Sequence, residues 1–314
     1  MRLRNVRESS MAELNARTGA FIAACGYEHR SPEISRLITA ESRRVAICFN
    51  EWTAAVARPE NERKFRARGF ELVQVGGNEP LAVQQLVSDV APPVFASERA
   101  VAFDISSMTR AWHGAIVRQL WTMDVTRTVE AFFAYVPATF RKPSVQSAPN
   151  EFVAPVHGFA SLATPDLPVA AIMGLGYEKE RALGVQQLLD PQQTLLLVPR
   201  SSKRDPFYTE VLRSNRDILS RTPQESVFEY SLSYPAATFA TLASVVAGLR
   251  ETYRVVLISL GPKILGLLCF LLATRFPDVS VWRVSSGVHG RPRDAVADLK
   301  RVVVLSTTWG GNAL

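Results

Sequence analysis

The sequence is poor in the residues that build metal sites and disulfide frameworks. It holds three cysteines and four histidines in 314 residues. Cys25, Cys48 and Cys269 each lie inside an apolar run, and neither a CxxC nor an HExxH spacing occurs. We therefore expect no metal site and no disulfide framework, and the lone thiols fit a reducing cytoplasm.

Long apolar runs and common catalytic signatures are also missing. The most apolar run, Ile264 to Ala273, is far shorter than the roughly 20 residues that a membrane-spanning helix needs, and the first residues lack the apolar core of a signal peptide. No GxSxG or P-loop pattern occurs, and Gly174-Leu175-Gly176 lacks the third glycine of the dinucleotide fingerprint. We expect a cytoplasmic protein with no membrane partner and no bound cofactor.

The charge of the chain favours an anionic partner. Lys and Arg number 36 against 29 Asp and Glu, which gives a formal net charge of +7. A basic chain suits partners from nucleic acid to a small phosphorylated ligand. The basic residues are spread along the sequence and lack the interleaved aromatic residues of single-strand binders. Charge alone leaves both kinds of partner open.

One stretch combines a buried strand, a polar turn and a helix. The apolar run 99–103 ends in Asp104-Ile105-Ser106-Ser107-Met108-Thr109-Arg110, and apolar residues then recur with helical spacing at 112, 116 and 120. In an open parallel sheet such a turn lies at the carboxyl edge, where ligands bind, and a Ser107 or Thr109 cap leaves helix N–H groups facing an anion. The alternative is that Asp104 and Ser106 only satisfy the turn.

The same strand, turn and helix unit recurs along the chain. Apolar strands over 19–26, 44–51, 70–77 and 128–136 alternate with helices, one of them with Ser31 as N-cap and Pro32 at its first position. A second series begins at 167, includes a helix over 207–219 and ends with a strand over 301–306 that closes its sheet. This pattern predicts an α/β protein of two tandem Rossmann-like parallel-sheet halves, residues 1–145 and 146–314, with residues 1–18 peripheral.

Two landmarks repeat between the halves. Gly26-Tyr27-Glu28 and Gly176-Tyr177-Glu178 lie 150 residues apart, and each follows the first strand of its half. An arginine follows each, Arg30 or Arg181, and a base stands at the mouth of the helix after each fourth strand. We infer an internal duplication in which the halves form a pseudo-dimer.

The predicted ligand site lies where the carboxyl edges of the two halves line one cleft. Its ligand-binding residues are predicted to be Tyr27, Arg30, Asp104, Ser106, Ser107, Thr109, Arg110, Tyr177, Arg181, Ser259, Gly261 and Lys263, with Ser285 and Ser286 nearby. Helix N-termini and bases suit phosphates, and the tyrosines suit stacking on bases. Glu28 and Glu178 are the candidate catalytic residues. The alternatives are that each Tyr packs at the sheet edge and that each Glu pairs with its own Arg.

The motif Asp104-Ile105-Ser106-Ser107-Met108-Thr109-Arg110 resembles the strand-to-helix motif of CRISPR-associated Rossmann-fold (CARF) sensor domains, typically Asp-Leu-Thr-Gly-Gly-Thr-Lys. A tandem of two such halves is similar to the SAVED domains of cyclic-oligonucleotide defence systems. The resemblance covers Asp104, Ser106, Thr109 and Arg110, with Ser107 and Met108 where the family usually has two glycines; in the second half, Gly261 and Lys263 echo it. It implies binding of a cyclic oligonucleotide across a dimer or pseudo-dimer.

These expectations give three classes of function. The first is a sensor of a prokaryotic antiviral defence system that binds a phosphorylated nucleotide between its halves and signals to an effector protein partner. The second is an enzyme that hydrolyses a nucleotide or nucleotide second messenger in the same cleft. The third is a scaffold subunit with a vestigial cleft.

Overall fold

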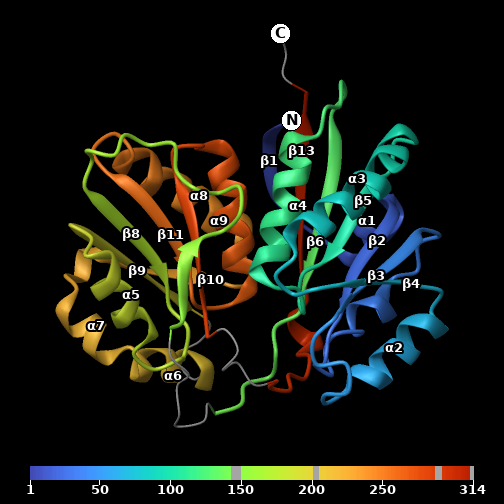
Figure 1. Cartoon of the computed structure of the whole chain (residues 1–314), viewed down its shortest axis with the longest axis horizontal. Helices are drawn as coiled ribbons and strands as arrows, with labels where there is room; N and C mark the ends of the chain where they lie inside the picture. Colours follow the sequence, from blue (N-terminus) through green and yellow to red (C-terminus); the bar gives the residue numbers. More distant parts are fainter. Residues whose placement is uncertain (143–149, 201–204, 287–291, 312–314) are drawn as a thin grey trace. The chain divides into compact units, whose positions relative to one another are not determined.

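The computed structural model of the chain describes residues 1–142, 150–200, 205–286 and 292–311. The chain divides into two compact units, which Figure 1 draws in the colours of the sequence. Unit 1 is Met1–Thr139 with Pro292–Leu314, and unit 2 is Phe140–Arg291. The predicted boundary between residues 145 and 146 lies outside the described residues.

Unit 1 is built on one mixed sheet, sheet 1. Its strands are β1 (Arg2–Ser9), β2 (Thr18–Cys25), β3 (Arg43–Phe49), β4 (Glu71–Val75), β5 (Ala100–Asp104), β6 (Val129–Tyr135) and β13 (Val303–Gly310). Its helices are α1 (Met11–Arg17), η1 (Ile34–Leu37), α2 (Arg58–Ala67), α3 (Pro80–Ala96), α4 (Arg110–Thr122) and η4 (Leu299–Arg301). The strand order is β1-β13-β6-β5-β2-β3-β4. The five neighbouring strands β6, β5, β2, β3 and β4 run parallel to one another. β13 is antiparallel to both β6 and β1.

Unit 2 is built on a second mixed sheet, sheet 2. Its strands are β7 (Phe152–Pro155), β8 (Val169–Gly174), β9 (Gln193–Arg200), β10 (Val227–Ser231), β11 (Arg254–Ser259) and β12 (Ser280–Ser285). Its helices are α5 (Arg181–Leu189), α6 (Pro206–Ser214), α7 (Arg216–Arg221), η2 (Gln224–Ser226), α8 (Pro235–Leu249) and α9 (Lys263–Arg275). The strand order is β10-β9-β8-β11-β12-β7, and only β7 runs antiparallel to its neighbour.

The parallel strands of the two sheets have the same order. If the five parallel strands of each unit are numbered along the chain, both sheets read 3-2-1-4-5. This order matches five of the six strands of the classic Rossmann arrangement, 3-2-1-4-5-6, in which ligands bind where the strand order reverses. The prediction of an α/β protein with two Rossmann-like halves is therefore confirmed.

In each sheet, an antiparallel strand lies next to the fifth parallel strand, and this antiparallel strand follows the parallel strands of the other sheet in the sequence. β7 follows β6 of sheet 1 in the sequence but pairs with β12 of sheet 2, and β13 follows β12 but pairs with β6. In Figure 1 the red β13 accordingly lies beside the green β6 and the dark blue β1. The prediction that residues 301–306 close the second sheet was wrong, because β13 finds its partners in sheet 1.

Helices cover both faces of each sheet, so the parallel strands are buried. Leu14 of α1, Ile34 of η1 and Phe65 of α2 pack on one face of sheet 1, and α3 and α4 pack together over the other face. In unit 2, α5, α6 and α7 cover one face through Val185, Val211 and Ile218. Burial on both faces explains why the parallel strands read as near-continuous apolar runs.

Two local predictions were wrong for identifiable reasons. The helix predicted after Ser31 is only the 3-10 turn η1, because the Ser31 hydroxyl donates to the carbonyl of Ala24 and accepts from the N–H of Gly26 instead of capping a helix. The helix predicted over 207–219 is two helices that meet at Asn215. Residues 1–18, expected to be peripheral, form β1 at the edge of sheet 1 and α1, which buries Leu14.

No helix in the described residues is long and apolar enough to cross a membrane.

Candidate functional site

The predicted site residues of unit 1 gather at the carboxyl edge of sheet 1. The central strand β2 ends beside Tyr27 and Glu28, and the neighbouring β5 ends at Asp104. Because these strands are parallel neighbours, the turns that follow them lie side by side. The Ser107 hydroxyl donates to Glu28 Oε2 over 3.2 Å, which joins the two turns directly.

Glu28 and Arg30 form a nearly buried ion pair in this edge. Arg30 Nε donates to Glu28 Oε2 at 2.7 Å, and the two side chains are 8% and 17% exposed. Arg30 also donates to the carbonyl of Val136 at the end of β6. Burial lowers the pKa of Arg30, but Glu28, Tyr135 and Asp104 together outweigh burial, so the net shift of the pKa is upward. The alternative prediction, that Glu28 pairs with its own arginine, is what the structure shows.

Asp104 and Ser106 hold the turn after β5. Asp104 Oδ1 accepts the N–H of Ser106 at 2.9 Å, and the Ser106 hydroxyl accepts the N–H of Val136 at 2.9 Å. Both side chains are fully buried. Their oxygens therefore hold the turn after β5 and join it to the end of β6. This is the structural role that was given as the alternative for Asp104 and Ser106.

Thr109 is the N-cap of α4, and it is one of the two residues that were predicted to cap this helix. Its hydroxyl accepts the N–H of Trp112 at 3.2 Å and donates to the carbonyl of Gly77 at 2.9 Å. Trp112 in turn donates to Gly76 and stacks on Phe49 with ring centroids 4.2 Å apart. The start of α4 is thus fixed against the ends of β3 and β4, and Arg110 stands at the first position of the helix.

Two tyrosines border the Glu28–Arg30 pair. Tyr135, at the end of β6, is buried, and burial raises its pKa, while the charges of Arg30 and Arg110 oppose that shift. Tyr27 is half-buried, and burial likewise raises its pKa. The sequence analysis did not single out Tyr135. Its place could have been predicted, because Tyr135 is the last residue of β6, the strand next to β5.

In unit 2 the corresponding pair is Glu178 and Arg181. Arg181 Nη1 lies 2.9 Å from Glu178 Oε2, and Arg181 Nη2 donates to the hydroxyl of Ser286 at 2.6 Å. The Arg181 side chain is 11% exposed, whereas that of Glu178 is 37% exposed. The structure brings these three residues together at the carboxyl edge of sheet 2.

Tyr177 and the glycines of unit 2 have clear packing roles. The Tyr177 ring meets Phe140 and Phe207 edge-on, with centroids 6.5 and 5.5 Å away. A Cβ on Gly261 would lie 2.4 Å from the carbonyl oxygen of Leu175, so only glycine allows the turns after β8 and β11 to approach this closely. Packing of the tyrosine at the sheet edge, the stated alternative, is therefore observed.

The remaining predicted residues of unit 2 follow β11. Ser259 ends that strand, its side chain is 3% exposed, and its hydroxyl has no hydrogen-bond partner in the described part of the chain. Lys263 is the first residue of α9, the position that Arg110 holds in α4. Both units thus place a base at the start of the helix after the fourth parallel strand.

A positioning residue that the sequence analysis missed also repeats. The Asn61 amide of α2 donates to the carbonyls of Gly26 and Glu28, and the Asn215 amide donates to the carbonyl of Gly176. Both asparagines are buried and lie between the second and third parallel strands of their unit. A lone polar residue inside a helical pattern gave no signal of this role.

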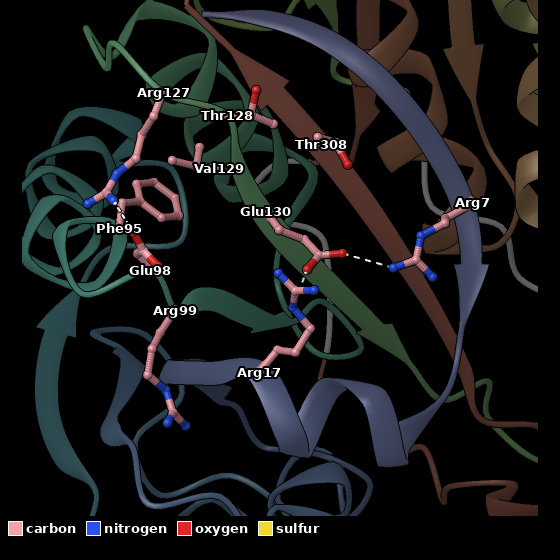
Figure 2. A pocket seen from close by; sticks show the side chains of 10 residues that line it. All are labelled: Arg7, Arg17, Phe95, Glu98, Arg99, Arg127, Thr128, Val129, Glu130 and Thr308. Atoms are coloured by element: carbon pink, nitrogen blue, oxygen red, sulfur yellow. Dashed lines mark hydrogen bonds and ion pairs between the residues drawn. The ribbon is translucent and has the colours of Figure 1, made fainter.

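A pocket of about 490 Å³ lies elsewhere in unit 1, at the amino ends of the parallel strands. We call it the arginine pocket; it is lined by Arg7, Arg17, Phe95, Glu98, Arg99, Arg127, Thr128, Val129, Glu130 and Thr308. Figure 2 shows Arg7 from β1 and Arg17 from α1 reaching the Glu130 carboxylate from two sides. The arginine pocket could not be predicted from the sequence, because its residues are scattered along the chain and form no motif.

Within the described ranges, no three His, Cys, Asp or Glu side chains come together as metal ligands would. No protein-family model matches the chain, and no curated protein is similar enough to count as a relative.

Proposed function

We propose that the protein is a nucleotide sensor that binds a phosphorylated nucleotide at the carboxyl edges of its two sheets. The observation that carries this proposal is the repetition of one set of side chains at equivalent positions. In each unit a Tyr-Glu pair with a nearby arginine follows the central strand, and a base begins the helix after the fourth strand. Such a repetition is expected if each unit carries the same kind of anion site at the carboxyl edge of its own sheet.

A phosphate suits these edges for physical reasons. The first N–H groups of α4 and α9 have no partners within their helices, and the helix dipole favours an anion there. Arg110 and Lys263 add one full positive charge to each helix start. A charge-assisted bond from such a base to a phosphate contributes about 1.5 to 3 kcal/mol.

The contacts of the Glu28 and Glu178 carboxylates favour a sensor over a hydrolase. A general base needs an oxygen that reaches the substrate or its water. Glu28 instead receives Arg30 on both oxygens and Ser107 on one of them, and Glu178 receives Arg181. We propose that the carboxylates orient these arginines. The resemblance of 104–110 to CARF domains supports a place in a prokaryotic antiviral defence system, with an effector protein as partner.

The experiment is a binding and turnover assay on the whole chain. Thermal shift and calorimetry with cyclic and linear oligonucleotides and mononucleotides should identify a nucleotide that raises the melting temperature. Lys263→Ala should weaken its binding about tenfold or more, whereas Arg43→Ala, an exposed arginine paired with Glu71, should not. Chromatography should recover the nucleotide intact.

Three results count against the proposal. No stabilising nucleotide in the panel would remove it. Equal effects of Lys263→Ala and Arg43→Ala would place binding away from the carboxyl edges. Hydrolysis that Glu28→Gln abolishes without weakening binding would make the protein an enzyme instead.

A further inference from the structure

The arginine pocket lies at the opposite edge of sheet 1 from the residues just described. Arg17 directly precedes β2, Arg99 directly precedes β5, and Thr128 directly precedes β6, so the pocket is at the amino ends of three parallel strands. Glu130 of β6 is in register with Thr308 of β13, which brings the C-terminal strand into the wall. A ligand here would occupy a site separate from the carboxyl edge.

Glu130 organises one side of the pocket. Its side chain is 10% exposed; Oε1 accepts from Arg7 at 3.0 Å and from the Ser306 hydroxyl at 2.6 Å, and Oε2 lies 2.8 Å from Arg17 Nε. One carboxylate thus attracts two guanidinium groups to the same side of the pocket, as Figure 2 shows. Glu13 pairs with Arg7 as well. A guanidinium group that an ion pair already orients loses less freedom when an anion binds.

The other side of the pocket carries positive charge that is weakly neutralised. Arg99 donates to the carbonyl of Thr18 at 2.6 Å and has no carboxylate partner in the part of the chain that the structure describes. Arg127 pairs with Glu98 at 3.1 Å, but the Glu98 side chain is 83% exposed. Such an exposed pair contributes little to stability, so an incoming anion displaces it at little cost.

The lining defines the class of ligand. All its cationic residues are arginines, whose planar guanidinium groups bind phosphate oxygens two at a time. The volume lies within the range of small-molecule sites, about 300 to 1,000 Å³. The apolar lining residues, Phe95 and Val129, are themselves buried, so they offer little surface for a base to stack on. These features select a compact phosphorylated molecule.

We propose that the arginine pocket binds a small polyphosphate or phosphorylated molecule that has no aromatic base. Its phosphate oxygens contact Arg99 and Arg127, and Arg17 faces them from the Glu130 side. Since β1, β6 and β13 all contribute to the wall, the bound anion stabilises the attachment of β1 and β13 to the parallel strands.

The test uses the whole chain and pyrophosphate as the probe, with isothermal calorimetry and melting temperature as readouts. Pyrophosphate should bind with a Kd below about 1 mM and raise the melting temperature. Arg99→Ala and Arg127→Ala should each weaken binding about tenfold or more. Arg43→Ala, which removes the same charge from an exposed pair, should leave the affinity unchanged.

Arg110→Ala separates this site from the carboxyl edge, because it removes the base at the start of α4. Pyrophosphate affinity that survives Arg110→Ala but not Arg127→Ala supports the arginine pocket whatever becomes of the nucleotide. If Arg110→Ala alone abolishes pyrophosphate binding, the anion binds at the carboxyl edge and this inference fails. It also fails if wild type shows no binding, or if Arg43→Ala weakens binding as much as Arg127→Ala does.

Two further probes test the ligand class. ADP should bind no more tightly than pyrophosphate, because the buried Phe95 and Val129 offer the base little surface, and acetate should bind far more weakly than either. Tight binding of ADP that depends on Arg127 would contradict the proposed class. If Arg99→Ala proves unfolded in the melting experiment, Arg127→Ala, whose side chain is 41% exposed, decides the result.

Discussion

The Asn61 side-chain amide donates a hydrogen bond of 2.9 Å to the carbonyl of Gly26, directly after the central strand of sheet 1. Asn215 makes the same contact to Gly176 in unit 2, over 2.6 Å. Two buried asparagines thus hold the two Gly-Tyr-Glu turns in equivalent ways. Together with the shared strand order, this contact is the most specific structural sign of the inferred duplication.

Asn61→Asp tests how strongly this turn is held. The change removes both donated bonds and places a carboxylate against the carbonyls of Gly26 and Glu28 in a fully buried position. We expect the free energy of unfolding to fall by about 3 to 5 kcal/mol at neutral pH, measured by urea denaturation. Asn5→Asp is the control, since Asn5 is exposed and only accepts a bond that Asp retains. Equal stabilities of the two variants would refute the role of Asn61.

Glu28→Gln and Glu178→Gln separate a buried ion pair from a half-exposed one. Without Glu28, the nearly buried guanidinium of Arg30 loses its counter-charge, and we expect a loss of about 3 kcal/mol in unfolding free energy. Glu178 is 37% exposed, so Glu178→Gln should cost no more than about 1 kcal/mol. Thermal and urea unfolding of both variants measure the contrast, and a larger loss in Glu178→Gln would contradict it.

The exchanged strands predict how the chain can be divided. A fragment of residues 1–142 lacks β13, which is the sheet partner of both β1 and β6. We expect this fragment to lack cooperative unfolding, and the same fragment joined to residues 292–314 by a flexible linker to regain it. Circular dichroism and chemical-shift dispersion report the difference. If the short fragment unfolds as cooperatively and at the same temperature as the joined one, β13 is dispensable.

The stability of β1 and α1 should depend on pH through Glu13. Hydrogen bonds from Arg7 and Ser9 lower the pKa of Glu13 from 4.5 to about 2. A carboxyl whose pKa is lower in the folded state stabilises fully above its unfolded pKa and loses that contribution as the pH falls. The difference in melting temperature between wild type and Glu13→Gln should therefore shrink from pH 4.5 towards pH 2. Glu71→Gln, in an exposed pair, is the control; a difference for Glu13→Gln that is constant with pH would contradict the account.

Much of the fold is predictable from local pattern. The strands β2, β5, β8 and β11 are covered on both faces, so each is an apolar run that the sequence displays directly. β1 and β7 escaped prediction because β1, at a sheet edge, is mostly polar and charged with only Leu3 and Val6 apolar, and β7 has only four residues. The place of β13 depends on pairing with a strand more than 160 residues away, for which the local sequence holds no signal.

Part of the candidate site was likewise predictable from the sequence, and part was not. The turn 104–110 was predictable because its polar residues interrupt an apolar run, and Thr109 caps α4 as one of two predicted caps. The detailed partners were not, since the contacts of Glu28 with Ser107 and of Ser106 with Val136 depend on which strands are neighbours. The arginine pocket combines residues from 7 to 308, so only the folded chain brings them together.

Arg110→Ala provides the most direct test of nucleotide binding at the carboxyl edge. With the nucleotide that stabilises the wild-type chain, we expect the affinity to fall ten- to a hundredfold while the melting temperature of the ligand-free protein stays nearly unchanged. That result means that Arg110 contacts the phosphate. A large fall in melting temperature with unchanged nucleotide affinity would contradict the account, because Arg110 would then hold the fold together and the nucleotide would bind elsewhere.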